Sequence, residues 1–177
     1  MKFIHLRCIL LIHIFFVISL PAFAQKKHTV KKSTTKTTEG NTVKNGIRLT
    51  NNGFKISEAY LFFDDESLVP EGNKVALNQN VNMLLIIDSG WADIGGRVFP
   101  GAKQVLKLSS GKEILNSEEL FATFDTTGVA PEDARYVTLN AVITEMKDKK
   151  NHVIVNFRVW DKKGTAEIMG SYKLYIK

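Results

Sequence analysis

Apolar and polar residues alternate with a period of two along most of this chain, and no other feature constrains its fold as strongly. Successive side chains of an extended strand point to opposite faces, so such alternation predicts strands that each bury one face. Six segments show the pattern: 54–63, 81–88, 105–108, 137–144, 153–160 and 172–176. Residues 84–87 are apolar on both faces, which predicts a central strand covered on both sides.

Turn-forming residues separate these segments. Asp161-Lys162-Lys163-Gly164 predicts a hairpin between the last two long strands. Six to eight short strands with frequent turns favour an all-β fold, an antiparallel two-layer β-sandwich, with a small barrel as the alternative. Two short helical turns are expected, one over 117–121 and one over 131–134, where Pro131 takes the first helical position.

The closing pattern of the chain resembles the last hairpin of immunoglobulin-like domains found in exported bacterial proteins. It consists of Val153–Trp160, the Asp-Lys-Lys-Gly turn and Tyr172–Ile176. The resemblance covers about a quarter of the chain and lacks the paired cysteines of antibody-type domains. It implies an immunoglobulin-like architecture and no particular activity.

The first residues read as an export signal. Lys2 and Arg7 precede the apolar run of 8–20, and Pro21-Ala22-Phe23-Ala24 ends it with small residues. A positive start, a short apolar core and a small-x-small end are typical of a cleavable signal peptide. The core is shorter than the roughly twenty residues of a membrane span. We therefore expect residues 1–24 to be removed, leaving an exported protein of the periplasm or the extracellular space without a stable membrane span.

The positive charge lies outside the expected domain. Of the 24 Lys and Arg, two lie in 1–24 and six in 25–45, which leaves 16 basic residues in 46–177 against 17 acidic ones. Segment 25–45 is rich in Lys and Thr and poor in large apolar residues, so it predicts a flexible basic leader. The domain of 46–177 lacks the basic surplus that nucleic-acid binding requires.

The residues available for catalysis are few. The single cysteine, Cys8, lies in the expected signal, and of four histidines only His152 belongs to the expected domain. This inventory excludes a zinc site built from Cys and His. His152 is therefore the only histidine of the domain that a catalytic relay could use, and it follows a turn. We expect a protein without enzymatic activity and without a cofactor.

One long connection differs from the rest of the scaffold. Residues 89–101 contain four glycines together with Trp91, Asp93, Arg97 and Phe99. Loops on a rigid sandwich often carry binding groups, and aromatic rings beside Asp and Arg suit sugars and peptides. These four residues are the candidate ligand-binding site. The alternative is structural: Trp91 and Phe99 fold inward, and Arg97 pairs with Asp93.

Acidic residues offer two further hypotheses. Asp64 and Asp65 follow an apolar strand end, where sandwich loops can gather oxygen ligands for calcium. The sequence thus predicts an exported non-enzymatic module that binds an envelope protein or a glycan. The alternatives are a calcium-supported carbohydrate-recognition domain, with Asp64 and Asp65 as metal ligands, and a small hydrolase that uses paired carboxylates.

Overall fold

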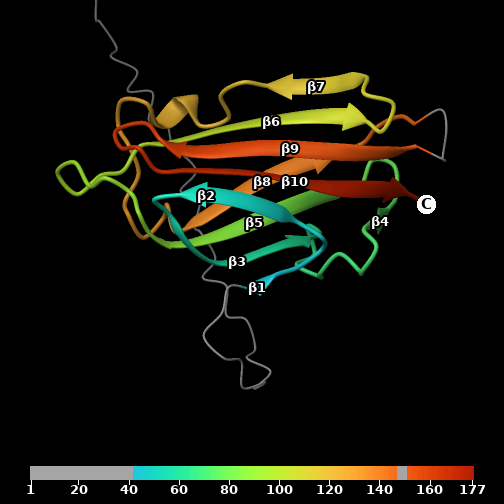
Figure 1. Cartoon of the computed structure of the whole chain (residues 1–177), viewed down its shortest axis with the longest axis horizontal. Coiled ribbons are helices and arrows are strands. Elements are labelled where there is room, and N and C mark those ends of the chain that lie inside the picture. Colours follow the sequence, from blue (N-terminus) through green and yellow to red (C-terminus); the bar gives the residue numbers. More distant parts are fainter. Residues whose placement is uncertain (1–41, 147–150) are drawn as a thin grey trace, which may run out of the picture. The chain divides into compact units, whose positions relative to one another are not determined.

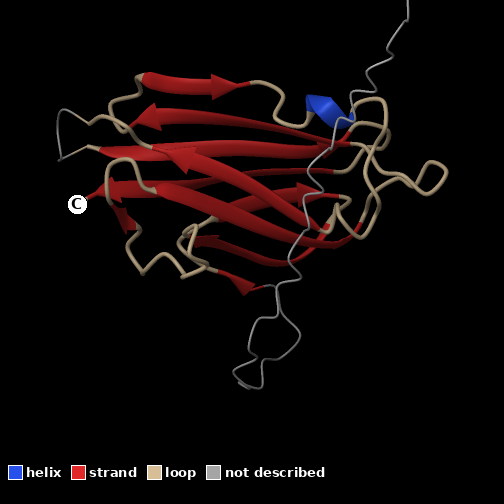
Figure 2. Ribbon diagram, turned by 180° about the vertical axis from the view of Figure 1, so that it is seen from behind, coloured by secondary structure: helices blue, strands red, loops and turns tan. Residues whose placement is uncertain are grey.

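The computed structural model describes residues 42–146 and 151–177 as two packed β-sheets (Figures 1 and 2). One sheet has the strand order β1-β3-β5-β8. The other has the order β2-β10-β9-β6-β7, with β4 paired to β10 as well. The bounds are β1 (Thr42–Val43), β2 (Arg48–Asn52), β3 (Lys55–Phe62), β4 (Lys74–Val75), β5 (Asn80–Ser89), β6 (Pro100–Leu108), β7 (Glu113–Ser117), β8 (Tyr136–Val142), β9 (His152–Asp161) and β10 (Glu167–Ile176).

The core lies between the two sheets and is built from the inward residues of each alternating strand. In β5, Val81, Met83, Leu85 and Ile87 are buried, and in β9 the matching residues are Val153, Val155, Phe157 and Val159. The all-β class and the two-layer sandwich predicted from the sequence are therefore confirmed. The immunoglobulin-like part of that expectation stays a resemblance.

The position of β5 was predicted only in part. It is central in its sheet, between β3 and β8, as expected. The outward side chains of Leu84 and Ile86 are half-buried, and no second layer from the described residues covers them. The apolar residues on both faces of 84–87 have separate causes: one face is core, and the other forms part of a solvent-facing surface.

A β-bulge in β3 changes which residues face the core. The register against β5 shifts between Ile56 and Glu58. Beyond the bulge, Ala59 and Leu61 are buried and Glu58 is exposed, whereas strict alternation would place Glu58 on the same face as Ile56. The bulge inserts one residue, and thereby keeps the carboxylate out of the core.

The folded part begins before residue 46, where the sequence placed the start of the domain. Thr42 and Val43 pair in parallel with Glu58 and Ala59, and Lys44 N donates to Ala59 O at 2.9 Å. Asn45 Oδ1 accepts from Leu61 N at 2.9 Å. Of the expected leader, residues 42–43 therefore belong to the sheet, and residues 44–45 are hydrogen-bonded to β3. The rest of that leader and the expected signal, residues 1–41, lie outside the described residues.

The expected helical turns differ in detail. Ser117 ends β7 instead of capping a helix, and the short helical turn is Ala122–Phe124 (Figure 2). Glu119 Oε1 accepts from Phe121 N at 3.0 Å just before that turn. At Pro131 the chain does form a turn, closed by Ala134 N donating to Ala130 O at 3.1 Å. In the described part of the chain, no helix is long and apolar enough to cross a membrane.

Candidate ligand-binding cavity at the end of the sandwich

Residues 89–101, the loop that contains the candidate ligand-binding residues predicted from the sequence, connect β5 in the four-stranded sheet to β6 in the other sheet. Gly90 starts this crossing with φ +120°. A Cβ there would lie 2.5 Å from Gly53 O and 2.8 Å from Phe54 Cα. The loop therefore passes directly over the corner between β2 and β3, and only glycine allows so close an approach.

Trp91 packs inward from this crossing. Its ring meets the buried Phe54 ring edge-on, with centroids 4.5 Å apart and an interplanar angle of 62°. The indole remains partly exposed, and its Nε1 is buried without a hydrogen-bond partner among the described residues. Trp91 thus anchors the loop to the core and keeps part of its surface available at the end of the sandwich.

A buried carboxylate fixes the base of the loop. Asp161, 3% exposed at the end of β9, accepts Ala92 N at 2.6 Å through Oδ2 and Lys163 N at 2.9 Å through Oδ1. Asp161 therefore joins the loop to the β9–β10 hairpin. Backbone hydrogen bonds in both directions between Val98 and Val129, at 3.0 and 2.9 Å, hold the other side of the loop.

The loop tip is a tight turn. Gly95 and Gly96 have φ +63° and +79°, and Arg97 N donates to Ile94 O at 3.3 Å. Asp93 Oδ1 accepts Gly96 N at 2.6 Å, so this carboxylate supports the turn. The described residues contain no ion pair between Asp93 and Arg97, although the structural alternative from the sequence expected one. Both side chains are exposed.

Two of the four candidate residues line the same cavity, of about 380 Å³. Trp91 and Asp93 meet there with Asp88 from the end of β5 and with Glu132 and Arg135 from the segment before β8. Arg135 Nη2 lies 2.9 Å from Asp88 Oδ1, which also accepts Ser57 Oγ at 3.2 Å. The cavity, named here the Trp91 cavity, therefore combines an aromatic ring with carboxylates and one guanidinium.

Arg97 and Phe99 do not line this cavity. Phe99 is half-buried just before β6, and Lys163 Nζ lies 5.2 Å from the centroid of its ring. Phe99 O also accepts Lys162 N at 2.9 Å. The four residues selected from the sequence therefore do not form one aromatic platform.

An aromatic surface adjoins the cavity on the outer side of the four-stranded sheet. Its residues, named here the aromatic face, are Tyr60, Phe62, Leu84, Ile86 and Tyr136. Tyr60 lies opposite Leu84, and Tyr136 lies opposite Ile86. The Arg135 guanidinium, which lines the cavity, is also 5.7 Å from the centroid of the Tyr136 ring. The cavity and the aromatic face therefore meet at Arg135.

The aromatic face was not predicted from the sequence, although its residues show a recognisable pattern. Tyr136 is 55% exposed, and Tyr60 and Phe62 are half-buried at alternate positions of β3. Partial burial and the nearby Glu58 carboxylate raise the pKa of Tyr60, so its hydroxyl stays protonated to a higher pH than that of an exposed tyrosine. Aromatic residues on the outward side of an alternating strand mark such a surface.

Asp64 and Asp65, the candidate calcium ligands, each accept hydrogen bonds from protein groups. Asp64 Oδ1 accepts Asn80 Nδ2 at 2.7 Å and Asn82 Nδ2 at 2.9 Å. Asp65 Oδ1 accepts Ser67 Oγ at 2.6 Å and Ser67 N at 3.0 Å. In the segments that the structure describes, no three His, Cys, Asp or Glu side chains gather in a way that could hold a metal ion.

These features define a β-sandwich with a mixed polar and aromatic cavity at one end. No protein-family model and no curated protein matches this chain. Among solved structures, it is similar to the crystal structure of the C-terminal domain of Wzt. The TM-score is 0.48 and the sequence identity 10%, over 78% of this chain and 82% of that one.

Proposed function

We propose that this protein is an exported, non-enzymatic module that binds a glycan of the cell envelope. The observation that carries the proposal is that the Trp91 cavity and the aromatic face meet at Arg135. The export part rests on the signal-like residues 1–24, and the site would act in the periplasm or outside the cell.

The chemistry of the combined surface suits a saccharide. Sugar rings present apolar C–H faces that pack on aromatic side chains, and Tyr136 and Trp91 offer such rings. Sugar hydroxyls donate to carboxylates and accept from guanidinium groups, and Asp93 and Arg135 supply both at the cavity. The aromatic face extends from the cavity over β8, β5 and β3, so a chain of several sugars could continue along it.

The experiment compares two exposed aromatic residues. Tyr136 belongs to the aromatic face, whereas Phe124 lies in the short helical turn Ala122–Phe124 and is part of neither the Trp91 cavity nor the aromatic face. The purified protein is screened against immobilised envelope glycans, and the dissociation constant of a retained glycan is measured by calorimetry. Tyr136→Ala should weaken binding about fivefold or more, since an aromatic contact contributes roughly 0.5–1.5 kcal/mol beyond its buried area.

Phe124→Ala is the matched control and should leave that dissociation constant unchanged. If no glycan is retained, or if both variants weaken binding equally, the proposal is wrong. An envelope protein captured through Tyr136 without any glycan would replace the glycan as the ligand.

A second candidate function follows from the three carboxylates at the cavity, Asp88, Asp93 and Glu132. Glycoside hydrolysis uses two carboxyl groups on either side of the scissile bond. Incubation of the retained glycan with the protein tests this candidate. Release of reducing ends that is lost in Asp93→Asn or Glu132→Gln would favour a hydrolase over a binding module.

A further inference from the structure

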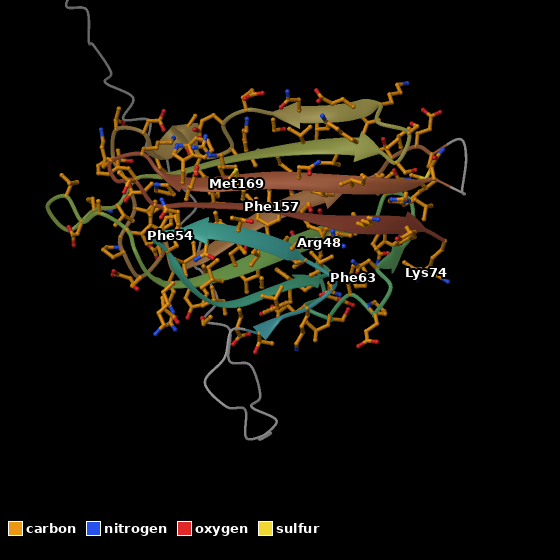
Figure 3. The ribbon with its side chains drawn as sticks, in the orientation of Figure 1. Arg48, Phe54, Phe63, Lys74, Phe157 and Met169 are labelled. Atoms are coloured by element: carbon orange, nitrogen blue, oxygen red, sulfur yellow. The ribbon has the colours of Figure 1, made fainter. Side chains whose placement is uncertain are left out.

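A second hollow lies on the other sheet, where β10 changes partners. β2 pairs with β10 over Glu167–Ser171, and β4 pairs with it over Tyr175–Ile176. The gap between these two pairings opens on a hollow of about 880 Å³. Figure 3 shows Arg48 and Lys74 at the strand ends that flank the gap. We call it the β2–β4 hollow.

A network of two asparagines makes the wall of this hollow rigid. Asn45 and Asn73 both have positive φ, at 55° and 50°. Asn45 Nδ2 donates to Asn73 Oδ1 at 3.1 Å, and Asn73 Nδ2 donates to Asn45 O at 2.7 Å and to Lys173 O at 2.9 Å. Asn73 is 5% exposed. The hollow is therefore bounded by fixed backbone, which favours a preformed site.

The charge lining the hollow is mainly positive. Lys44, Arg48 and Lys173 line it together with a single acid, Glu71. Several other surface cations are paired, among them Arg158 with Glu167 at 2.7 Å, Lys103 with Glu118 at 3.8 Å and Lys107 with Glu113 at 3.7 Å. No ion pair is recorded for the three cations of the hollow within 42–146 and 151–177.

Arg48, Lys173 and Tyr175 lie on the same outward face. Arg48 is directly opposite Ser171, and Lys173 and Tyr175 follow at alternate positions of β10. Diagonal neighbours on adjacent strands lie roughly 7–8 Å apart, so both cations can reach one anionic group. Tyr175 is 39% exposed, and its ring centroid lies 5.2 Å from that of His152. An aromatic ring thus adjoins the pair of cations.

We propose that the β2–β4 hollow binds a saccharide that carries an anionic group, with Arg48 and Lys173 holding the anion and Tyr175 packing against the sugar ring. The anionic group is a carboxylate of a uronic acid or a phosphate ester, which the same cations recognise. This site is separate from the Trp91 cavity and the aromatic face.

The test measures binding of a tetramer of galacturonic acid to the purified protein by calorimetry. Its fully methyl-esterified form has the same carbon skeleton without the charge. We expect binding of the acid to weaken at least tenfold on esterification and to fall as the salt concentration rises from 50 to 300 mM, because salt screens exposed charges. Phosphate added as a competitor should displace the tetramer if the anion contact dominates.

The variant Arg48→Gln/Lys173→Gln removes two charges from the hollow. Lys55→Gln/Lys112→Gln removes two exposed charges elsewhere and is the matched control. The first should weaken binding of the acid tetramer about tenfold and the second less than twofold. Circular dichroism melting of both variants verifies that each is folded.

Several outcomes would overturn the proposal. These are equal losses in the two double variants, equal binding of the ester and the acid, or no binding of the tetramer. Binding only to vesicles that contain phosphatidylglycerol would assign the hollow to a lipid surface instead. Loss of tetramer binding in Tyr136→Ala, with binding kept in Arg48→Gln/Lys173→Gln, would instead place the tetramer at the aromatic face, so failure here and failure of the glycan site around Trp91 are distinguishable.

Discussion

Gly170 of β10 lies directly opposite Phe157 of β9, and the Phe157 ring fills the space that a side chain at position 170 would need. A Cβ at Gly170 would collide with Phe157 Cζ and approach Arg48 O to 2.8 Å. The same relationship recurs on the outer side of this sheet, where the Trp160 indole covers Gly101 of β6. In both pairs an aromatic ring shields the backbone that a glycine leaves bare.

Gly170→Ala should therefore destabilise the protein by about 1–3 kcal/mol, the usual cost of overpacking a filled core. Chemical denaturation measures the change in the free energy of unfolding. Met169→Ala, at the exposed neighbouring position, is the control and should change it much less. Phe157→Leu added to Gly170→Ala should recover part of the loss, and a purely additive double variant would contradict the steric explanation.

Asp161→Asn should loosen the loop of 89–101 and destabilise the protein by about 1–3 kcal/mol. The buried carboxylate accepts one hydrogen bond from a backbone N–H at each of its two oxygens. In asparagine an NH2 group replaces one of these oxygens, so one backbone N–H would face another donor and lose its acceptor. Hydrogen exchange at Ala92 should accelerate more than exchange in β5. Asp133→Asn, at an exposed turn, is the control. Unchanged exchange at Ala92 would show that Asp161 does not hold the loop.

Ser67→Ala should raise the pKa of Asp65. The Ser67 hydroxyl and backbone N–H bind the ionised carboxylate and hold its pKa below the usual value. Because the folded-state pKa is the lower one, the stabilisation is present above about pH 4 and is lost as the pH falls through the folded-state pKa. Titration of the Asp65 carboxyl by NMR, in the unsubstituted protein and in Ser67→Ala, measures the shift. An unchanged Asp65 pKa would contradict this account.

Side-chain alternation predicted the sandwich because core burial acts on every second residue of a long strand. It predicted β3, β5, β6, β8, β9 and β10 within a few residues at most ends. It missed β2 and β7, whose side chains are largely exposed, since their pairing depends on backbone hydrogen bonds. It also missed the bulge at Ser57, because the shift in face follows from the register against β5.

The candidate site was predicted in part for a similar reason. The composition of 89–101 identified Trp91 and Asp93, which do line one cavity. Asp88 lies near the end of β5 and Arg135 lies just before β8. Nothing in the sequence around either residue indicates that the two meet at this cavity. Likewise, the role of Asp161 in fixing Ala92 depends on a contact between residues 69 positions apart.

The pairing of β2 with β10 has a consequence for how the molecule reaches its native state. Arg48 finds its neighbour Ser171 only after nearly the whole described chain has been synthesised. Contacts of such long range slow folding, since a large loop must close before they form. Until then β2 has no strand partner, whereas β3, β5 and β8 can already pair with one another, so the four-stranded sheet can form before β2 joins the other sheet.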